Sequence, residues 1–165
     1  MQIARFFRHL ATGPIAVRRH FPSSALNAIE TAVREGETRH SGEIRFVVEA
    51  ALEPARLLRG QSGRERAIEV FSQLRVWDTE HNNGVLIYLL LADHDVEIVA
   101  DRGIHGKVGT AGWEVICRRM EAEFRAGRFE AGGLAGIKAV GELLLKHCPN
   151  VAGDTDELPN PPAVL

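Results

Sequence analysis

Cysteine, long apolar runs and an excess of basic residues are all lacking in this chain of 165 residues. The two cysteines, Cys117 and Cys148, are too few for a disulfide framework and too isolated for a zinc knuckle. No apolar run approaches the roughly 20 residues that a membrane-spanning helix needs. Arginines Arg5 and Arg8 interrupt the N-terminal segment, which makes it a poor signal peptide. We therefore expect a cytoplasmic globular domain without a transmembrane segment.

The formal net charge of −2 excludes another class of function. A nucleic-acid binder needs a positive excess to neutralise phosphates, so we expect no nucleic-acid partner. The G-x-S-x-G elbow, the P-loop, the dinucleotide fingerprint after a strand and the H-E-x-x-H motif are all missing. The catalytic residues of an enzyme, if the chain is one, are therefore unknown at this stage.

Three segments can be distinguished along the chain. Residues 1–21 form a basic, amphipathic extension in which Ile3, Phe6, Phe7 and Leu10 recur at helical spacing. This extension could rest on a membrane surface, peripheral to the bilayer, or dock on the domain as a short helix. Residues 22–149 carry the pattern of one folded domain. Residues 150–165 are acidic and rich in proline, which predicts a flexible or loosely wrapped tail.

The central segment alternates between helical and extended patterns. Helices are predicted at about 23–40, 62–77, 110–127 and 131–147, and strands at 43–50, 85–91 and 96–100, the last two forming a hairpin. Ser62 and Glu65 form a capping box at the start of the second helix, whose inward residues are predicted to be Ile68, Phe71 and Leu74. The run 85–91 (VLIYLLL) is apolar throughout, which is typical of a strand covered by helices on both faces.

These patterns predict an α/β fold, a three-layer α/β/α sandwich around a small mixed sheet of one parallel pair and one antiparallel hairpin strand. The residues expected in the core are Leu86, Tyr88, Leu90, Val96, Ile98, Trp113, Met120 and Ile137.

Strand direction predicts which polar residues meet. A helix joins the strands that begin at Glu43 and near Asn83, so these strands should be parallel, and the hairpin returns Asp101 to the edge where both begin. The residues expected at this edge are Glu37, Glu43, Asp78, Thr79, Asn83 and Asp101. Clustered carboxylates repel one another unless a cation is present, and oxygen ligands suit Ca²⁺ or Mg²⁺. The alternative is that these acids are separate solvated residues of loops and caps.

Other charged residues have competing interpretations. Asp93, His94 and Asp95 have the composition of a metal motif, but a hairpin tip of turn-forming residues explains them as well. Arg102 and Arg45 are candidates for phosphate contacts, and each could equally face solvent.

Several stretches resemble the TPM domain family. Residues 83–88 (NGVLIY), 96–104 (VEIVADRGI) and Trp113 are similar to the core of TPM domains, and 41–45 (SGEIR) is similar to the first strand of short bacterial members. Residues 124–129 (FRAGRF) and the glycine-rich last helix also match. The resemblance covers roughly residues 21–149 and implies a sheet sandwiched by helices with Rossmann-like layering.

The resemblance also implies functions. Family members are credited with binding Ca²⁺ or Mg²⁺ through acidic residues in a crevice, and a plant member is credited with acid phosphatase activity. The positions that carry over are Glu43, Asp101, Glu37, Thr79, Asn83 and Asp78. Three hypotheses follow: a cation-binding module that presents a surface to a partner protein, a weak metal-assisted phosphatase, and a structural adaptor without an ion.

Overall fold

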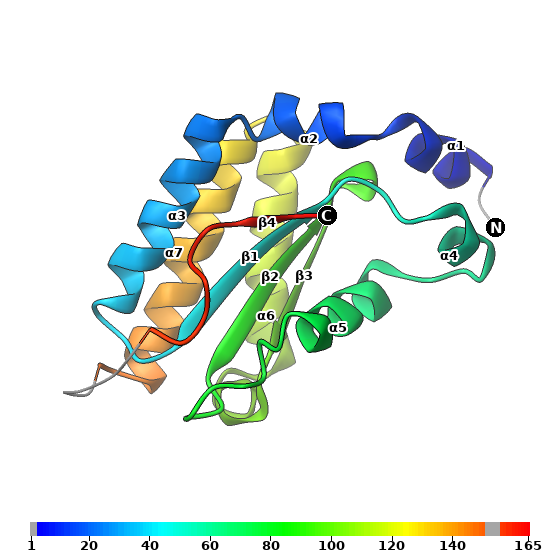
Figure 1. Ribbon diagram of the computed structural model, residues 1–165. Coiled ribbons are helices and arrows are strands. Elements are labelled where there is room, and N and C mark those ends of the chain that lie inside the picture. Colours follow the sequence, from blue (N-terminus) through cyan, green and yellow to red (C-terminus); the bar gives the residue numbers. More distant parts are fainter. Residues whose placement is uncertain (1–2, 151–155) are drawn as a thin grey trace.

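A four-stranded mixed sheet lies at the centre of the computed structural model, which describes residues 3–150 and 156–165 (Figure 1). The strands are β1 (Glu43–Glu49), β2 (Gly84–Leu90), β3 (Asp95–Ala100) and β4 (Ala163–Val164), in the order β3-β2-β1-β4. β1 is parallel to β2 and to β4, and β3 is antiparallel to β2. The predicted parallel pair and hairpin strand are confirmed.

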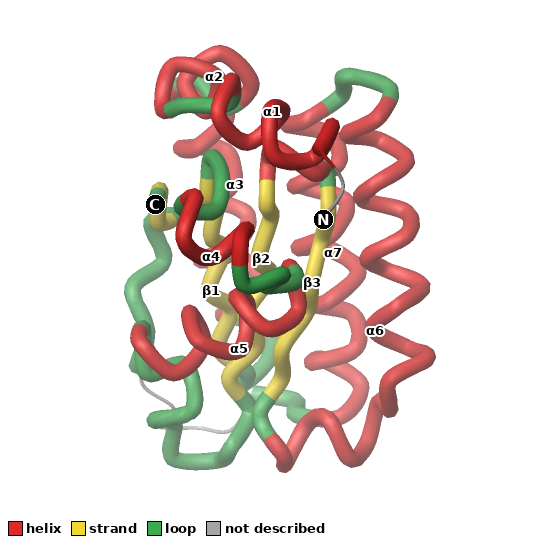
Figure 2. The backbone as a smooth tube through the Cα atoms, turned by 90° about the vertical axis from the view of Figure 1, so that its right-hand side faces the viewer, coloured by secondary structure: helices red, strands yellow, loops and turns green. Residues whose placement is uncertain are grey.

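Helices cover both faces of this sheet. One face packs against α3 (Ser23–Glu37), α6 (Arg102–Arg125) and α7 (Phe129–His147). The other packs against α5 (Gly63–Gln73) and the short α4 (Pro54–Leu58). Two N-terminal helices, α1 (Ile3–Ala11) and α2 (Pro14–His20), lie across one end of the layers, where a 3₁₀ turn (η1, Leu91–Asp93) joins β2 to β3 (Figure 2). The predicted three-layer α/β/α sandwich is confirmed.

Each face of the sheet has its own core. Ile44, Phe46 and Val48 of β1 point towards α3 and α7, whereas Val47 points towards α5. All eight residues predicted for the core are buried, at 0–3% exposure. The core residues could be predicted because the alternation of side chains along β1 and the continuous apolar run of β2 are both visible in the sequence.

The buried residues of α5 lie one position earlier in the sequence than the prediction placed them. The capping box is present, with Glu65 N donating to the Ser62 hydroxyl and Ser62 N donating to the Glu65 carboxylate. Ala67 and Val70 are buried, however, and Ile68 is about half exposed. The helix is turned so that Arg66 can reach the buried Glu49 of β1, a partner that helical periodicity alone does not reveal.

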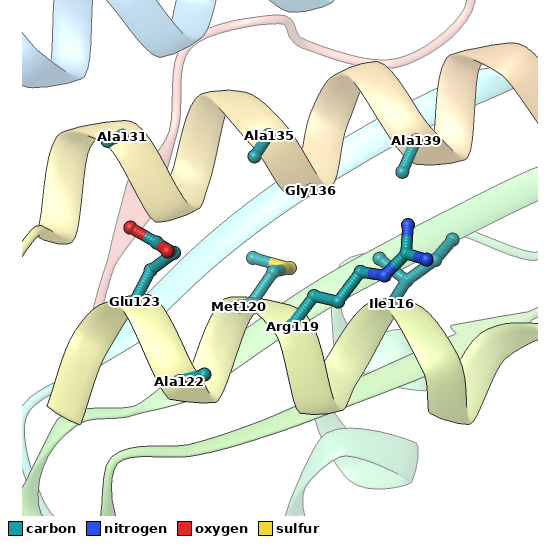
Figure 3. A pocket seen from close by; sticks show the side chains of 9 residues that line it. All are labelled: Ile116, Arg119, Met120, Ala122, Glu123, Ala131, Ala135, Gly136 and Ala139. Carbon is teal, nitrogen blue, oxygen red and sulfur yellow. The ribbon is translucent and has the colours of Figure 1, made fainter. Parts of the chain in front are cut away.

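α6 and α7 approach closely because α7 contains glycine at their contact. A Cβ atom on Gly136 would lie 2.2 Å from Met120 Sδ, so a larger residue there would force the Met120 side chain to move. Ala131, Ala135 and Ala139 of α7 line a pocket of about 500 Å³ between the helices (Figure 3). α6 also begins before its predicted start at Thr110 and is kinked at Gly109, whose φ is +74°.

Of the two alternatives for the tail, flexible or loosely wrapped, residues 156–165 show the wrapped one. β4 pairs with the edge of β1, and Leu158 is buried. Arg45, on the exposed side of β1, donates to the carbonyls of Pro159 and Pro161. Proline suits this segment because it lies at a sheet edge, where few ladder hydrogen bonds are needed. Residues 151–155 of the predicted tail lie outside the described residues.

Within residues 3–150 and 156–165, no helix combines the length and the apolar character that crossing a membrane requires.

Candidate functional site

The starts of β1 and β2 and the end of β3 share one edge of the sheet. Glu43 pairs with Gly84 across the β1–β2 ladder, and Asp101 N donates to Gly84 O over 2.9 Å. Glu43 and Asp101 therefore flank Gly84 from two sides, and the edge predicted from strand direction is confirmed. The side chains at this edge nevertheless divide into two groups.

Three carboxylates form the first group. Glu37 at the end of α3, Glu43 at the start of β1 and Asp156 of the tail each place an oxygen within 4.8 Å of the others. They line a pocket of about 400 Å³, to which Arg34, Asn150 and Asn160 also contribute. Glu43 is buried, Glu37 half-buried and Asp156 exposed. We call Glu37, Glu43 and Asp156 the acidic triad.

Backbone amides hold two members of the acidic triad in place. Glu37 Oε1 accepts a hydrogen bond of 3.0 Å from Ile44 N. The two oxygens of Glu43 accept from Glu157 N at 3.2 Å and Leu158 N at 3.1 Å. Glu37 Oε2 is buried and has no hydrogen-bond partner among the described residues. An unpaired buried carboxylate oxygen is costly, and a cation in the pocket would satisfy it.

Burial dominates the electrostatics of this pocket. Burial raises the pKa of Glu37 to about 8, and the negative charges of Glu43 and Asp156 add to this effect against the hydrogen bond from Ile44. Burial likewise raises the pKa of Glu43 to about 7, although its two amide donors oppose the change. Both acids thus hold protons near neutral pH when no cation compensates their charge.

The other residues predicted for the site form a second group with structural contacts. Asn83 N donates to Thr79 Oγ1 over 3.2 Å, and Asn83 Nδ2 donates to the carbonyl of Ser41, which ties the β2 start to the β1 start. Asp101 caps α6 by accepting from Arg102 N at 2.6 Å. Asp78 is exposed, 4.0 Å from Arg75. None of the four belongs to the acidic triad.

Arg45 and Arg102, the candidates for phosphate contacts, are not among the residues that line this pocket. Arg45 is committed to the tail carbonyls described above, and burial lowers its pKa. Arg102 is exposed at the first position of α6. The cation that does line the pocket is Arg34, one helical turn before Glu37, and it also lies 3.7 Å from Glu30.

Asp156 is the residue that sequence reasoning missed. It lies in an acidic, proline-rich segment, a composition typical of a disordered tail. Its position depends on β4 pairing with β1 and on the burial of Leu158. The apolar residues among the prolines, at 158 and 163–165, were the available signal, and they are too few to form a recognisable pattern.

At the opposite edge of the sheet two acids, Glu49 and Asp93, are paired with arginines. Glu49 is buried and accepts from Tyr88 Oη at 2.7 Å and Arg66 Nε at 2.8 Å. Asp93 lies between Arg5, whose Nε is 2.9 Å away, and Arg8. Asp93 and Glu49 therefore serve as docking points for helices, in agreement with the interpretation of residues 93–95 as a hairpin tip.

Comparison with known proteins agrees with this architecture. The model of the TPM domain matches residues 20–143. The solution structure of the BA42 protein from the psychrophilic bacterium Bizionia argentinensis is 32% identical, with a TM-score of 0.77 over 88% of this chain and 95% of that one. The solution structure of the N-terminal domain of a protein from P. gingivalis is 24% identical, with a TM-score of 0.57 over 73% of this chain and 76% of that one, which shows a likeness of fold. No curated protein matches the chain.

Proposed function

We propose that this chain, which belongs to the TPM domain family, binds a divalent cation, Ca²⁺ or Mg²⁺, through the acidic triad and acts as a binding module that presents this end of the sheet to a partner protein. The single observation that carries the proposal is the convergence of Glu37, Glu43 and Asp156 within 4.8 Å. These ligands come from three separate segments, α3, β1 and the tail.

The chemistry of the donors supports a hard cation. All three side chains offer carboxylate oxygens, and the side chain of Asn160 donates to Asp156 Oδ2 over 2.8 Å beside them. Ca²⁺ and Mg²⁺ prefer oxygen ligands of these kinds, whereas Zn²⁺ sites are usually built from cysteine and histidine. The unpartnered Glu37 Oε2 supplies a ligand atom that no hydrogen bond has to release.

Protons compete with the cation for these oxygens. Because the pKa of Glu37 is raised to about 8 and that of Glu43 to about 7, binding must displace protons below pH 8. The affinity for the cation should therefore rise steadily from pH 6 to pH 8.5. A site made of ordinary surface acids, already ionised at pH 6, would show no such rise.

Thermal unfolding with added Ca²⁺ or Mg²⁺ tests the proposal. A ligand that binds only the folded state stabilises by about 2.7 kcal/mol at a hundredfold excess over the dissociation constant. Asp156→Asn should abolish this gain, and Glu157→Gln, the neighbouring acid outside the triad, should retain it. Absence of any gain at millimolar cation in the unmodified chain would contradict the proposal.

The same variants separate the module from a phosphatase. Asp101→Asn shows whether Asp101 also binds the ion. Only if it does should this variant lose the stabilisation by added cation. For the module, phosphate monoesters should not be turned over although the cation binds. Metal-dependent turnover that disappears in Asp156→Asn would favour the metal-assisted phosphatase instead.

A further inference from the structure

The N-terminal helix α1 docks with its charged side towards the protein. Arg5 Nε lies 2.9 Å from Asp93 Oδ2, and Arg8 contacts the other oxygen of the same carboxylate. His9 is buried beside them, with Nε2 3.1 Å from Asp93 Oδ2. His9 Nδ1 accepts from Leu52 N over 3.0 Å, so the neutral ring carries its proton on Nε2, facing Asp93.

This docking leaves the apolar side of α1 facing solvent. Ile3, Phe7 and Leu10 recur at helical spacing, and their exposed fractions are 67%, 64% and 56%. An amphipathic helix that is docked for packing normally buries this side and exposes the charged one. In α1 only Phe6 packs against the core, and the other three large apolar residues stay exposed while the charged side is docked. The arginines that interrupt the apolar pattern serve to attach the helix, so its apolar row is available to something outside this chain.

α2 continues the same surface and adds charge. Ile15 is 82% exposed, and Arg18 and Arg19, three and four residues later, lie on the same side of the helix. Val17, on the opposite side, is buried. The aliphatic parts of arginine side chains next to an exposed isoleucine can pack against an apolar surface while the guanidinium groups remain in water.

Both helices present these sides away from the body of the protein. α1 and α2 lie along one end of the molecule, beyond η1 and the carboxyl end of β2 (Figures 1 and 2). Their buried residues, His9 and Val17, face inward, so Phe7 and Ile15 must face outward. This end of the sheet is opposite to the edge that holds the acidic triad.

The formal charges carried by α1 and α2 themselves are all positive. No aspartate or glutamate precedes Glu30 in the sequence, and Arg8, Arg18 and Arg19 are all exposed. Asp93, which lies beneath α1, is already neutralised by Arg5 and Arg8. A second copy of this chain would bring Arg18 and Arg19 against their own counterparts in a self-complementary contact. Charge complementarity therefore favours an anionic partner.

We propose that α1 and α2 form a lipid-binding surface that rests on an anionic bilayer, with Ile3, Phe7, Leu10 and Ile15 entering the acyl boundary and Arg18 and Arg19 contacting lipid headgroups. Amphipathic helices with basic residues beside an apolar face bind at the bilayer interface in this way. Each basic residue near an anionic surface contributes about 1 kcal/mol, which is about a fivefold gain in affinity. Helices of nine and seven residues give weak, reversible binding.

Vesicle co-sedimentation of the whole chain tests this proposal. Binding is expected to vesicles that contain phosphatidylserine, to be much weaker with phosphatidylcholine alone, and to fall as salt is raised. Arg18→Gln with Arg19→Gln should weaken binding about 25-fold. The matched control is Arg118→Gln with Arg119→Gln, a second pair of adjacent exposed arginines that lies on α6, and it should bind like the unmodified chain.

The apolar contribution is tested separately. Phe7→Ser with Ile15→Ser should abolish vesicle binding without changing the melting temperature, because both side chains are exposed. Ile68→Ser with Val115→Ser removes exposed apolar groups from α5 and α6 and should change nothing. The proposal is overturned if the chain does not bind anionic vesicles at low salt, or if the control pairs lose binding as much as the test pairs. Concentration-dependent dimers that disappear in the Phe7 and Ile15 variant would assign the surface to a second copy instead.

Discussion

Trp113 shows how a single residue of this fold can be tested. It lies on α6, is 3% exposed and belongs to the core between the sheet and the α6–α7 layer. Trp113→Ala should lower the free energy of unfolding by about 3–5 kcal/mol, the range for emptying a large aromatic site. Chemical denaturation measures this loss. Trp77→Ala is the matched control, because Trp77 is about half exposed, and its effect should stay within about 0.5 kcal/mol. An unchanged denaturation midpoint for Trp113→Ala would place this residue outside the core.

The residue scale also marks the limit of what the sequence could reveal about the site. Glu43 and Glu37 were predictable because each adjoins a recognisable element, the first strand and the helix before it. Asp101 was predicted at the correct edge, where its observed contact is the cap of α6. Asp156 could not be assigned, because its position comes from contacts more than a hundred residues away along the chain. Local patterns carry no information about such contacts.

At the scale of elements, the main helices and strands could be predicted from the periodicity of apolar residues. The way in which the two terminal segments, α1 and β4, dock on the domain could not. The apolar run of β2 and the alternation of β1 fix the sheet and its two covered faces. β4 is two residues long, and α1 docks through Arg5, Arg8 and His9, with Phe6 as its one apolar residue packed against the core among the described residues. β4 is too short to show a pattern, and the apolar pattern of α1 lies mainly on the side that stays exposed. The rotation of α5 towards Glu49 belongs to the same class, since a buried ion pair decided it.

The C-terminal segment is the element whose loss should matter most to the site. Leu158 anchors it by burial, and the adjoining amides bind Glu43. Leu158→Ala should lower stability by about 2 kcal/mol, the lower end for a buried leucine, because the segment lies at the surface. It should also reduce the stabilisation by Ca²⁺, since Asp156 is then held less firmly. Amide exchange at residues 163–165 reports the release of β4. Unchanged exchange together with an unchanged cation response would show that Leu158 does not hold the segment.

At the scale of the whole molecule, the acidic triad gives stability an unusual dependence on pH. Folding raises the pKa of Glu37 from 4.5 to about 8 and that of Glu43 from 4.5 to about 7. Between pH 4.5 and 8 the folded state binds more protons than the unfolded chain, so this contribution is full below pH 4.5 and is lost as pH rises through 7 and 8. Stability without a cation should therefore fall between pH 7 and pH 9.

Two buried histidines have the opposite effect on stability, and they titrate at lower pH than the two glutamates. Burial lowers the pKa of His9 and His94 below 6.5, so their contribution is lost on acidification and is already complete above about pH 7.5. Thermal unfolding in a chelator from pH 7 to 9, compared between the unmodified chain and Glu37→Gln, measures the effect of Glu37. Added Ca²⁺ should abolish the decline, and Glu37→Gln should flatten it without a cation. A stability that rises over this range in the chelator would contradict the raised pKa values.

The most direct test of the central claim is a Ca²⁺ titration followed residue by residue by NMR. The account predicts that the amides of Ile44, Glu157 and Leu158 change most, because they donate to the carboxylates that would bind the ion. The changes should saturate together and shift to lower Ca²⁺ concentration as pH rises from 6 to 8. Changes confined to residues 93–95, or none at millimolar Ca²⁺, would contradict a cation site built from Glu37, Glu43 and Asp156.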